Sequence, residues 1–353
     1  MPRFVLAAPA LRSLRAWRVF LSLSFASVFA LAARAGDRVE IVWPTPNTAW
    51  AQGRPLSEIL QQAGSGDPES GGFGGVRSGG LHFHEGIDIK CLKRDRHGEP
   101  VDSIFAAMTG IVRHISTSAG DSSYGRYIVL EHPDQSPGIY TLYAHLSRIA
   151  PGLRVGDHVQ AGQQIGIMGH SSGGYSIPRD RAHLHFEIGV MVTRDFQAWY
   201  DYKKFGSTND HGLWNGNNLM GFDPLDFLNQ WRAHRVNTFQ EYFAQMEPAV
   251  RVKIATRRMP DYVLRYPALV TKPIPLNLAG WEIKFNWTGI PFAWTPLTPM
   301  ETMGLVPDRP TLYDVNESLI SRERSKSVAI QHRGIWFPGH DLEVVLQQLF
   351  GLR

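Results

Sequence analysis

The chain has 353 residues, of which 43% are hydrophobic and 19% charged, and its formal net charge is +4. This length allows one large domain or two smaller ones, and the composition excludes a chain that is disordered throughout. A single cysteine, Cys91, excludes an intramolecular disulfide and any cysteine-rich zinc module. A bound metal would therefore need histidine and carboxylate ligands. Ten of the 14 histidines lie between residues 82 and 185.

The first 35 residues have the pattern of a secretory signal peptide. Four arginines precede an uncharged stretch over residues 19–33, which leads into Ala33-Arg34-Ala35, a small-x-small cleavage pattern. The stretch is shorter than the roughly 18 apolar residues that a spanning helix needs, so an uncleaved anchor is the weaker alternative. We therefore expect an exported protein, periplasmic or secreted, with no transmembrane segment in the mature chain.

The signal peptide also accounts for the positive charge of the chain. It holds five arginines and no acidic residue, so residues 36–353 carry 31 basic against 32 acidic side chains. A nucleic-acid partner is therefore not expected, because the mature chain has no excess of positive charge.

The segments after the signal peptide predict a β-rich core. Residues 62–80 are rich in glycine, which predicts a loop or a series of turns. From residue 81 to 190, short apolar or alternating runs are separated by Gly, Pro, Asp and Ser, which favours antiparallel β structure. The expected strands span residues 83–89, 110–115, 126–131, 139–144, 164–168 and 183–190.

Two of these expected strands carry side chains that could bind a metal. In the run His-Leu-His-Phe-Glu-Ile, alternation would place His183, His185 and Glu187 on one face and the apolar residues on the other. His84 and Asp88 are an even number of positions apart, so we expect them to share a face as well. Imidazoles and a carboxylate suit Zn²⁺, and three protein ligands would leave a fourth position for water, as in catalytic zinc sites.

A further histidine lies between these two segments. His145 follows Tyr143 by two positions, so alternation predicts that both face the same side of a strand. A lone His-x-His pair is more often a surface or packed pair than a ligand pair. The metal interpretation therefore depends on the joint occurrence of all three segments, with His82 as a less favoured alternative ligand. Glu85 and Glu187 are candidates for hydrogen bonds to the ligands.

Ordered motifs over residues 70–190 resemble those of the lysostaphin/LytM-type zinc metallopeptidases, a family that cleaves peptidoglycan cross-links. In chain order the motifs are SGGFGGVR at 70–77, HEGID at 84–88, PV at 100–101 with AAMTGIV at 106–112, GRYIVLEH at 125–132, TLYAHLS at 141–147, VGDHVQAGQQIG at 155–166 and HLHFEI at 183–188.

The resemblance implies a mainly β fold with a two-sheet antiparallel β core of the LytM/lysostaphin type, here with loop insertions and a C-terminal α+β extension. It implies one Zn²⁺ per chain, held by His84, Asp88 and His185. It also implies that His145 and His183 are catalytic, one as general base on the metal-bound water and both in stabilising the oxyanion.

The implied function is that of an exported zinc endopeptidase that hydrolyses peptide bonds in peptidoglycan cross-links, with zinc-activated water as the nucleophile. One alternative is a non-hydrolytic module that binds peptidoglycan or activates another hydrolase. Such modules typically lack one or more ligands, whereas all five residues are present here. Another alternative is a zinc peptidase that acts on an exported protein. The oligomeric state stays open.

The chain departs from the family pattern in three places. Residues 171–182 and 194–220 are insertions that we expect to wall the substrate groove. The resemblance does not reach residues 236–353, where alternation over residues 281–287 predicts a strand with an aromatic face. Near the C-terminus, apolar residues at helical spacing predict an amphipathic helix over residues 341–350.

The expected organisation has four parts. Residues 1–35 are the signal peptide, and residues 36–69 are an N-terminal segment that could cover the groove, with Asn47 as a fourth ligand. Residues 70–235 form the zinc metallopeptidase domain, and residues 236–353 form a C-terminal extension or small domain of unknown role. Cys91 is expected to be a small buried hydrophobic residue and not a nucleophile.

Overall fold

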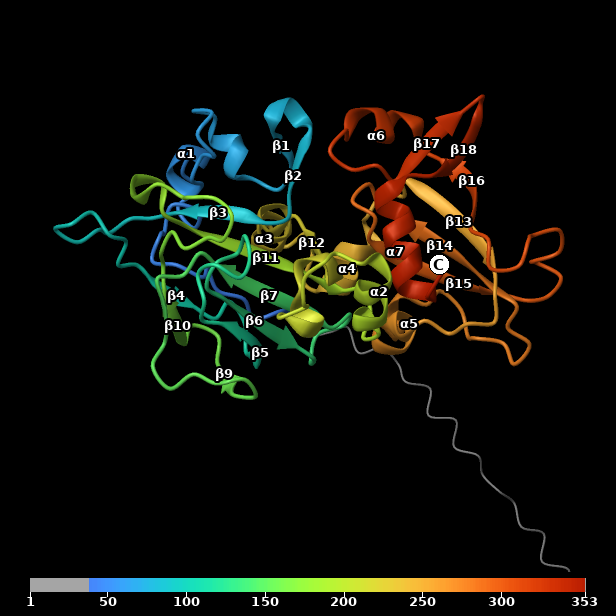
Figure 1. The fold of residues 1–353 in the computed structure, drawn as a ribbon, viewed down its shortest axis with the longest axis horizontal. Helices are drawn as coiled ribbons and strands as arrows, with labels where there is room; N and C mark the ends of the chain where they lie inside the picture. Colours follow the sequence, from blue (N-terminus) through green and yellow to red (C-terminus); the bar gives the residue numbers. More distant parts are fainter. Residues whose placement is uncertain (1–37, 353) are drawn as a thin grey trace, which may run out of the picture. The chain divides into compact units, whose positions relative to one another are not determined.

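The structure is a computed structural model, and it describes residues 38–352 (Figure 1). The signal peptide predicted for residues 1–35 lies outside this range. Among the helices of the described range, none combines the length and the apolarity that a bilayer-spanning segment requires. The described residues belong to a single compact unit, and one hydrophobic core contains residues of both the predicted peptidase domain and the C-terminal region.

A seven-stranded antiparallel sheet forms the centre of the predicted peptidase domain. Six of its strands follow the order β12-β11-β7-β6-β5-β9, and β3 pairs with the first half of β11. The strands are β3 (Ile87–Lys90), β5 (Gly110–Ser116), β6 (Tyr127–His132), β7 (Ile139–Ala144), β9 (His158–Val159), β11 (His183–Met191) and β12 (Leu219–Phe222).

Two smaller antiparallel sheets accompany the central sheet. One has the order β4-β10-β8, and the other is a hairpin of β1 and β2. Their strands are β1 (Gly74–Arg77), β2 (His82–His84), β4 (Ser103–Phe105), β8 (Arg148–Ile149) and β10 (Gln164–Ile167). Helix in residues 38–235 is limited to α1 (Leu56–Ile59), α2 (Phe196–Lys203), α3 (Pro224–Arg232) and short 3₁₀ turns. The prediction of a mainly β, antiparallel core with more than one sheet is confirmed.

The strand expected over residues 83–89 is in fact two strands, β2 and β3. The chain turns between them at Glu85 and Gly86. A Cβ atom at Gly86 would collide with the carbonyl oxygen of Phe186 in β11. Glycine at this position therefore lets the chain pass close enough to β11 for β3 to pair with it.

The two faces of β11 differ in the way that its alternation predicts. Leu184, Phe186 and Ile188 are fully buried in the main hydrophobic core. The same core includes residues of the C-terminal region, such as Trp281 and Leu342. The opposite face of β11 carries His183, His185 and Glu187. Because its apolar face is packed in the core, the strand holds these polar side chains in fixed positions on its other face.

Residues 236–352 form an α+β region. Its main sheet has the order β15-β14-β13-β16, and β17 pairs with β18. The elements are α4 (Phe239–Ala244), β13 (Val250–Ala255), α5 (Asp261–Arg265), β14 (Gly280–Phe285), β15 (Pro291–Leu297), β16 (Thr311–Val315), α6 (Glu317–Arg322), β17 (Ala329–His332), β18 (Ile335–Pro338) and α7 (His340–Phe350). The predicted aromatic strand is β14, which ends before Trp287, and the predicted helix is α7, whose apolar face is buried.

Candidate metal centre

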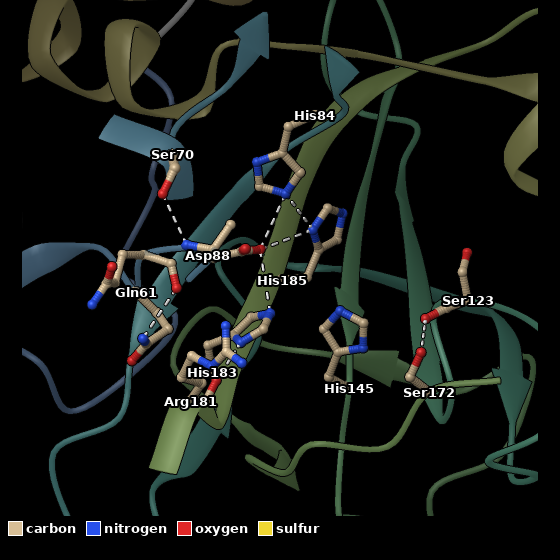
Figure 2. Close-up of polar contacts among 12 residues, drawn as sticks. Gln61, Ser70, His84, Asp88, Ser123, His145, Ser172, Arg181, His183 and His185 are labelled. Atoms are coloured by element: carbon tan, nitrogen blue, oxygen red, sulfur yellow. Dashed lines mark hydrogen bonds and ion pairs between the residues drawn. The ribbon is translucent and has the colours of Figure 1, made fainter. Parts of the chain in front are cut away.

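Side chains from three neighbouring strands meet at one end of the central sheet (Figure 2). His84 is the last residue of β2, and Asp88 of β3 pairs with His185 of β11. The Nε2 atom of His84 lies 3.1 Å from Asp88 Oδ1 and 2.9 Å from His185 Nδ1. His185 Nδ1 lies 3.2 Å from Asp88 Oδ1, and none of the three residues is more than 5% exposed.

The spacing and hydrogen bonds of these three atoms fit a zinc ion. Ligands at 2.0–2.1 Å from a tetrahedral zinc lie about 3.3 Å apart. His84 Nδ1 bonds to Gly72 O at 2.6 Å, and His185 Nε2 bonds to Glu187 Oε1 at 2.9 Å. Because both oxygens accept these bonds, the ring nitrogens that face each other are the ones available to a metal. This is the one group of three potential ligands found among residues 38–352.

The electrostatics of the cluster also favour a cation. Burial alone would lower the pKa of His185, yet its hydrogen bonds to Asp88 and Glu187 raise it to about 9. Burial would raise the pKa of Asp88, but the charges of His183 and His84 hold it well below its usual range. The pocket therefore combines a carboxylate with surroundings that stabilise positive charge beside it.

Asp88 is oriented by an arginine whose role the sequence did not reveal. Arg77 Nη2 donates to Asp88 Oδ2 at 2.5 Å, and Arg77 Nε donates to Ser70 O at 3.0 Å. Asp88 can thus offer Oδ1 to a metal while Arg77 fixes Oδ2. Arg77 belongs to one of the motifs that carry the family resemblance, but its spacing from Asp88 gave no sign of this ion pair.

His145 and His183 lie beside the metal cluster, with ring centroids 4.9 Å apart. The Nδ1 atom of His145 bonds to Ser171 O at 2.9 Å, and that of His183 bonds to Arg181 O at 2.7 Å. Both carbonyls accept these bonds, so each Nε2 atom is free to take a proton. His183 Nε2 lies 3.4 Å from Asp88 Oδ1.

Both of these imidazoles are held in the neutral form. Burial lowers the pKa of His145 well below its usual value, and electrostatic repulsion between its protonated form and the His183 and His185 rings lowers it further. Burial also lowers the pKa of His183, although the charge of Asp88 opposes this change. A neutral imidazole with a free Nε2 atom is the form that can act as a general base.

The prediction that Tyr143 and His145 share a face is wrong. Tyr143 lies opposite Phe186 and faces the hydrophobic core, where the two rings are 5.3 Å apart. Strand β7 ends at Ala144, and His145 adopts a left-handed backbone conformation with φ of 61°. This conformation is unfavourable for a residue other than glycine, and it turns the imidazole to the face that carries His185.

The three candidate ligands line one groove together with His145 and His183, and its volume is about 550 Å³. The insertion over residues 171–182 contributes Tyr175, Ile177 and Arg181 to its walls. The insertion over residues 194–220 was expected to do the same, but none of its described residues lines the groove. Its Trp214 instead packs against a second apolar cluster that includes Tyr127.

Arg181 places a positive charge in the groove wall on a firmly held loop. Arg94 anchors this loop, because its guanidinium donates to Arg179 O at 2.6 Å and to Asp180 O at 3.1 Å. Within the described chain, no carboxylate lies within ion-pair distance of the Arg181 guanidinium. Arg77, the other arginine of the groove, is paired with Asp88.

Glu187 connects the metal centre to two tyrosines. Its Oε1 atom accepts from Tyr124 at 2.7 Å as well as from His185, and its Oε2 atom accepts from Tyr140 at 2.7 Å. The alternation of β11 placed Glu187 on the face of His185, which gave the signal for this contact. Nothing in the spacing of Tyr124 or Tyr140 indicated their part. Glu85, the other candidate, lines the groove and is exposed.

Two further expectations concern residues near the site. Asn47 is not a groove residue, because its side chain donates to Glu58 O at 2.9 Å and accepts from Ala49 N at 2.9 Å. The segment over residues 36–69 instead contributes Gln62 and Ala63 to the groove. Cys91 is 8% exposed, and burial followed by the charge of Asp102 raises its pKa to about 11. The thiol is therefore a poor nucleophile at neutral pH.

Several solved structures are similar to part of this chain. A zinc-containing peptidase from Vibrio cholerae is 22% identical, with a TM-score of 0.29, and the match covers 43% of this chain and 37% of that one. A prophage-encoded M23 protein from Enterococcus faecalis is 28% identical over its catalytic domain, with a TM-score of 0.25 and coverage of 33% and 75%. The catalytic domain of lysostaphin from Staphylococcus simulans is 24% identical, with a TM-score of 0.29 and coverage of 45% and 89%.

At the level of sequence, the chain matches the model of one protein family but no curated protein. Residues 82–195 match the model of peptidase family M23, and this segment contains the three candidate ligands together with His145 and His183. The match confirms, for residues 82–195, the metallopeptidase family that the sequence motifs resemble.

Proposed function

We propose that the protein is an exported, zinc-dependent endopeptidase that hydrolyses peptide bonds in peptidoglycan cross-links. The proposal depends on one observation above all: the buried cluster of His84, Asp88 and His185 shares a groove with His145 and His183. Three ligands and two free imidazole nitrogens are the groups that hydrolysis by a metal-activated water requires. The match to peptidase family M23 supports the same class of reaction.

A zinc ion held by His84, Asp88 and His185 would polarise the scissile carbonyl and lower the pKa of a water to about 7. One of the two other imidazoles, that of His145 or His183, accepts the proton on its free Nε2 atom and passes it to the leaving amine. While it carries this proton, that imidazole can donate an Nε2–H hydrogen bond to the negative charge that develops on the carbonyl oxygen. Ser171 O and Arg181 O hold the rings in position for these steps.

Two alternatives differ from this proposal in testable ways. A module that only binds peptidoglycan would have no need for five intact site residues. A zinc peptidase with an exported protein as substrate would keep the metal chemistry and leave peptidoglycan unchanged. Export itself is proposed from the signal-peptide pattern of residues 1–35.

Metal analysis of the mature chain tests the zinc site directly. We expect one zinc per chain, and its loss in His185→Ala. The matched control is His158→Ala, because His158 is an exposed histidine of β9 outside the groove. A mature chain that is folded but holds no zinc under non-chelating conditions would contradict the proposal. Equal zinc content in the His185→Ala and His158→Ala variants would contradict the ligand assignment.

A further inference from the structure

The β1–β2 hairpin carries two groups of the candidate metal centre, although a hairpin of this kind has little stability of its own. His84 ends β2, and Arg77, which orients Asp88, ends β1. Among the described strands, β1 and β2 pair only with each other. An isolated two-stranded ribbon is marginally stable at best. The spacing of the metal ligands therefore depends on whatever holds this hairpin in place.

The back of the hairpin packs against the C-terminal region. Because successive side chains of a strand point to opposite faces, Phe83 points away from the groove that His84 lines. The Phe83 ring packs against Phe73 and Trp287, with centroids 5.2 and 5.7 Å away, and the Phe73 and Trp287 centroids are 6.1 Å apart. Lys326 Nζ lies 4.3 Å from the centroid of the Phe83 ring.

The backbone of β1 lies equally close to the C-terminal region. A Cβ atom at Gly74 would lie 3.0 Å from the Trp287 ring, and Gly74 has a φ of +94°, which favours glycine. A Cβ atom at Gly75 would lie 2.8 Å from Ser325 Oγ. The two glycines thus allow a contact between β1 and residues 287–326 that larger side chains would block.

The turn that presents Trp287 is itself rigid. It joins β14 to β15, and Asn286 is 8% exposed. The Asn286 Oδ1 atom accepts from Thr288 N at 3.1 Å, from Thr288 Oγ1 at 2.9 Å and from Ile290 N at 2.8 Å. The position of Trp287 is therefore set by the sheet of the C-terminal region and not by the hairpin that it contacts.

We propose that Trp287 is a positioning residue for the metal centre. Its ring supports the back of β2, so that His84 Nε2 stays at the spacing from Asp88 and His185 that zinc needs. This gives residues 236–353 a role in the metal site, although that region lies outside the match to the peptidase family. The inference rests on the zinc binding of the proposed function.

The test is the zinc dissociation constant of the mature chain, measured by competition with a chromophoric chelator. We expect Trp287→Ala to weaken zinc binding by about tenfold or more, as loss of a group that supports a metal ligand does. Trp287→Phe keeps an aromatic ring and should recover most of the affinity. Tyr313→Ala, which removes an exposed aromatic side chain from β16 of the same region, is the control and should bind zinc as the wild type does.

A second readout separates local positioning from general instability. Amide hydrogen exchange should speed up over residues 73–84 in Trp287→Ala and stay unchanged in β11. If Trp287→Ala does not fold, Trp287→Leu keeps apolar volume and takes its place. The inference is overturned if Trp287→Ala or Trp287→Leu is folded and binds zinc as tightly as the wild type does. This result would leave the proposed function intact. A wild-type chain that binds no zinc overturns the proposed function as well.

Discussion

Each ligand of the candidate metal centre is oriented by a second group. His84 is held by Gly72 O, Asp88 by Arg77 and His185 by Glu187. Such partners fix the orientation of a ligand and adjust its basicity, so they influence metal affinity without touching the metal. Of the three partners, Glu187 is the most deeply buried, at 1% exposure.

Replacing Glu187 with glutamine should weaken zinc binding by about tenfold. The amide is close in shape to the carboxylate but carries no charge to stabilise the His185 imidazole. The zinc dissociation constant of the folded variant measures the effect. Glu131→Gln is the control, because Glu131 lies in β6 of the same sheet and pairs with Arg113 away from the metal cluster. Equal affinities for the two variants would mean that Glu187 does not tune the site.

Removing the charge of Arg181 should raise KM and leave kcat nearly unchanged. A guanidinium without a carboxylate partner in the groove wall is suited to bind a carboxylate of the substrate, and such charged hydrogen bonds are worth about 1.5–3 kcal/mol. We therefore expect KM for a cross-linked peptide with a free carboxylate to rise about tenfold or more in Arg181→Ala. Arg154→Ala removes an exposed arginine elsewhere and should change neither constant. A fall in kcat alone would contradict this role.

The residues of the site differ in how far their positions could be predicted. Alternation within β11 correctly placed His183, His185 and Glu187 on one face, because a regular strand fixes the direction of each side chain. His145 was assigned to the wrong face of the sheet, because its left-handed backbone interrupts the alternation. Arg77 could not be linked to Asp88, since their contact forms only once the β1–β2 hairpin has folded.

At the scale of elements, a buried histidine ties together the strands that support the site. His132 of β6 bonds to Thr109 O at 2.9 Å and to Thr141 Oγ1 of β7 at 2.8 Å. Thr141 in turn bonds to Tyr143 at 3.0 Å, and Tyr143 accepts from Ala107 N at 2.7 Å. Burial lowers the pKa of His132 from its usual 6.5 to about 4, although Thr109 O and the charge of Glu131 oppose this change.

The stability of the chain should therefore fall as the pH is lowered from about 6.5 to 4. In this interval the unfolded chain binds a proton at residue 132 that the folded chain does not. The lowered pKa corresponds to about 3 kcal/mol of unfolding free energy, fully present above pH 6.5 and lost by about pH 4. Urea unfolding of the mature chain and of His132→Gln at several pH values measures this contribution. A variant with the same pH dependence as the wild type would contradict the assignment.

The strands that alternation marks were predicted well, whereas the pairings that hold them were not. The expected strand over residues 139–144 coincides with β7, and that over residues 183–190 lacks only the last residue of β11. Strand β12 was not expected, because its four residues lie at the end of a long insertion and are stabilised by pairing with the second half of β11. The β1–β2 hairpin was not expected either, since part of it falls in the glycine-rich stretch and its support comes from distant residues.

At the scale of the whole molecule, the C-terminal region also holds the far end of β11. Arg265 donates to Met191 O at 3.0 Å and to Val192 O at 2.9 Å, and Met191 N donates to Tyr266 at 3.2 Å. The main hydrophobic core joins residues of both regions. The strand that carries His183 and His185 is thus anchored by α5, in addition to the support that Trp287 gives to β2.

We therefore expect residues 36–353 to unfold as one cooperative unit. Calorimetry of the mature chain should show a single transition, with equal calorimetric and van't Hoff enthalpies. A chain that ends at residue 235 should fail to form a stable, zinc-binding domain, because it exposes the apolar surface that residues 236–353 cover. Two separate transitions, or a stable zinc-binding fragment over residues 36–235, would contradict this expectation.

The central claim is that the groove around His84, Asp88 and His185 hydrolyses cross-links of peptidoglycan. The most direct test is to digest purified sacculi with the zinc-loaded mature chain and to separate the resulting muropeptides. With the wild-type chain, we expect cross-linked muropeptides to decrease and uncross-linked ones to increase. The His145→Ala and His183→Ala variants should leave the muropeptide profile as it is in undigested sacculi. An unchanged muropeptide profile with the zinc-loaded, folded wild-type chain would contradict the account.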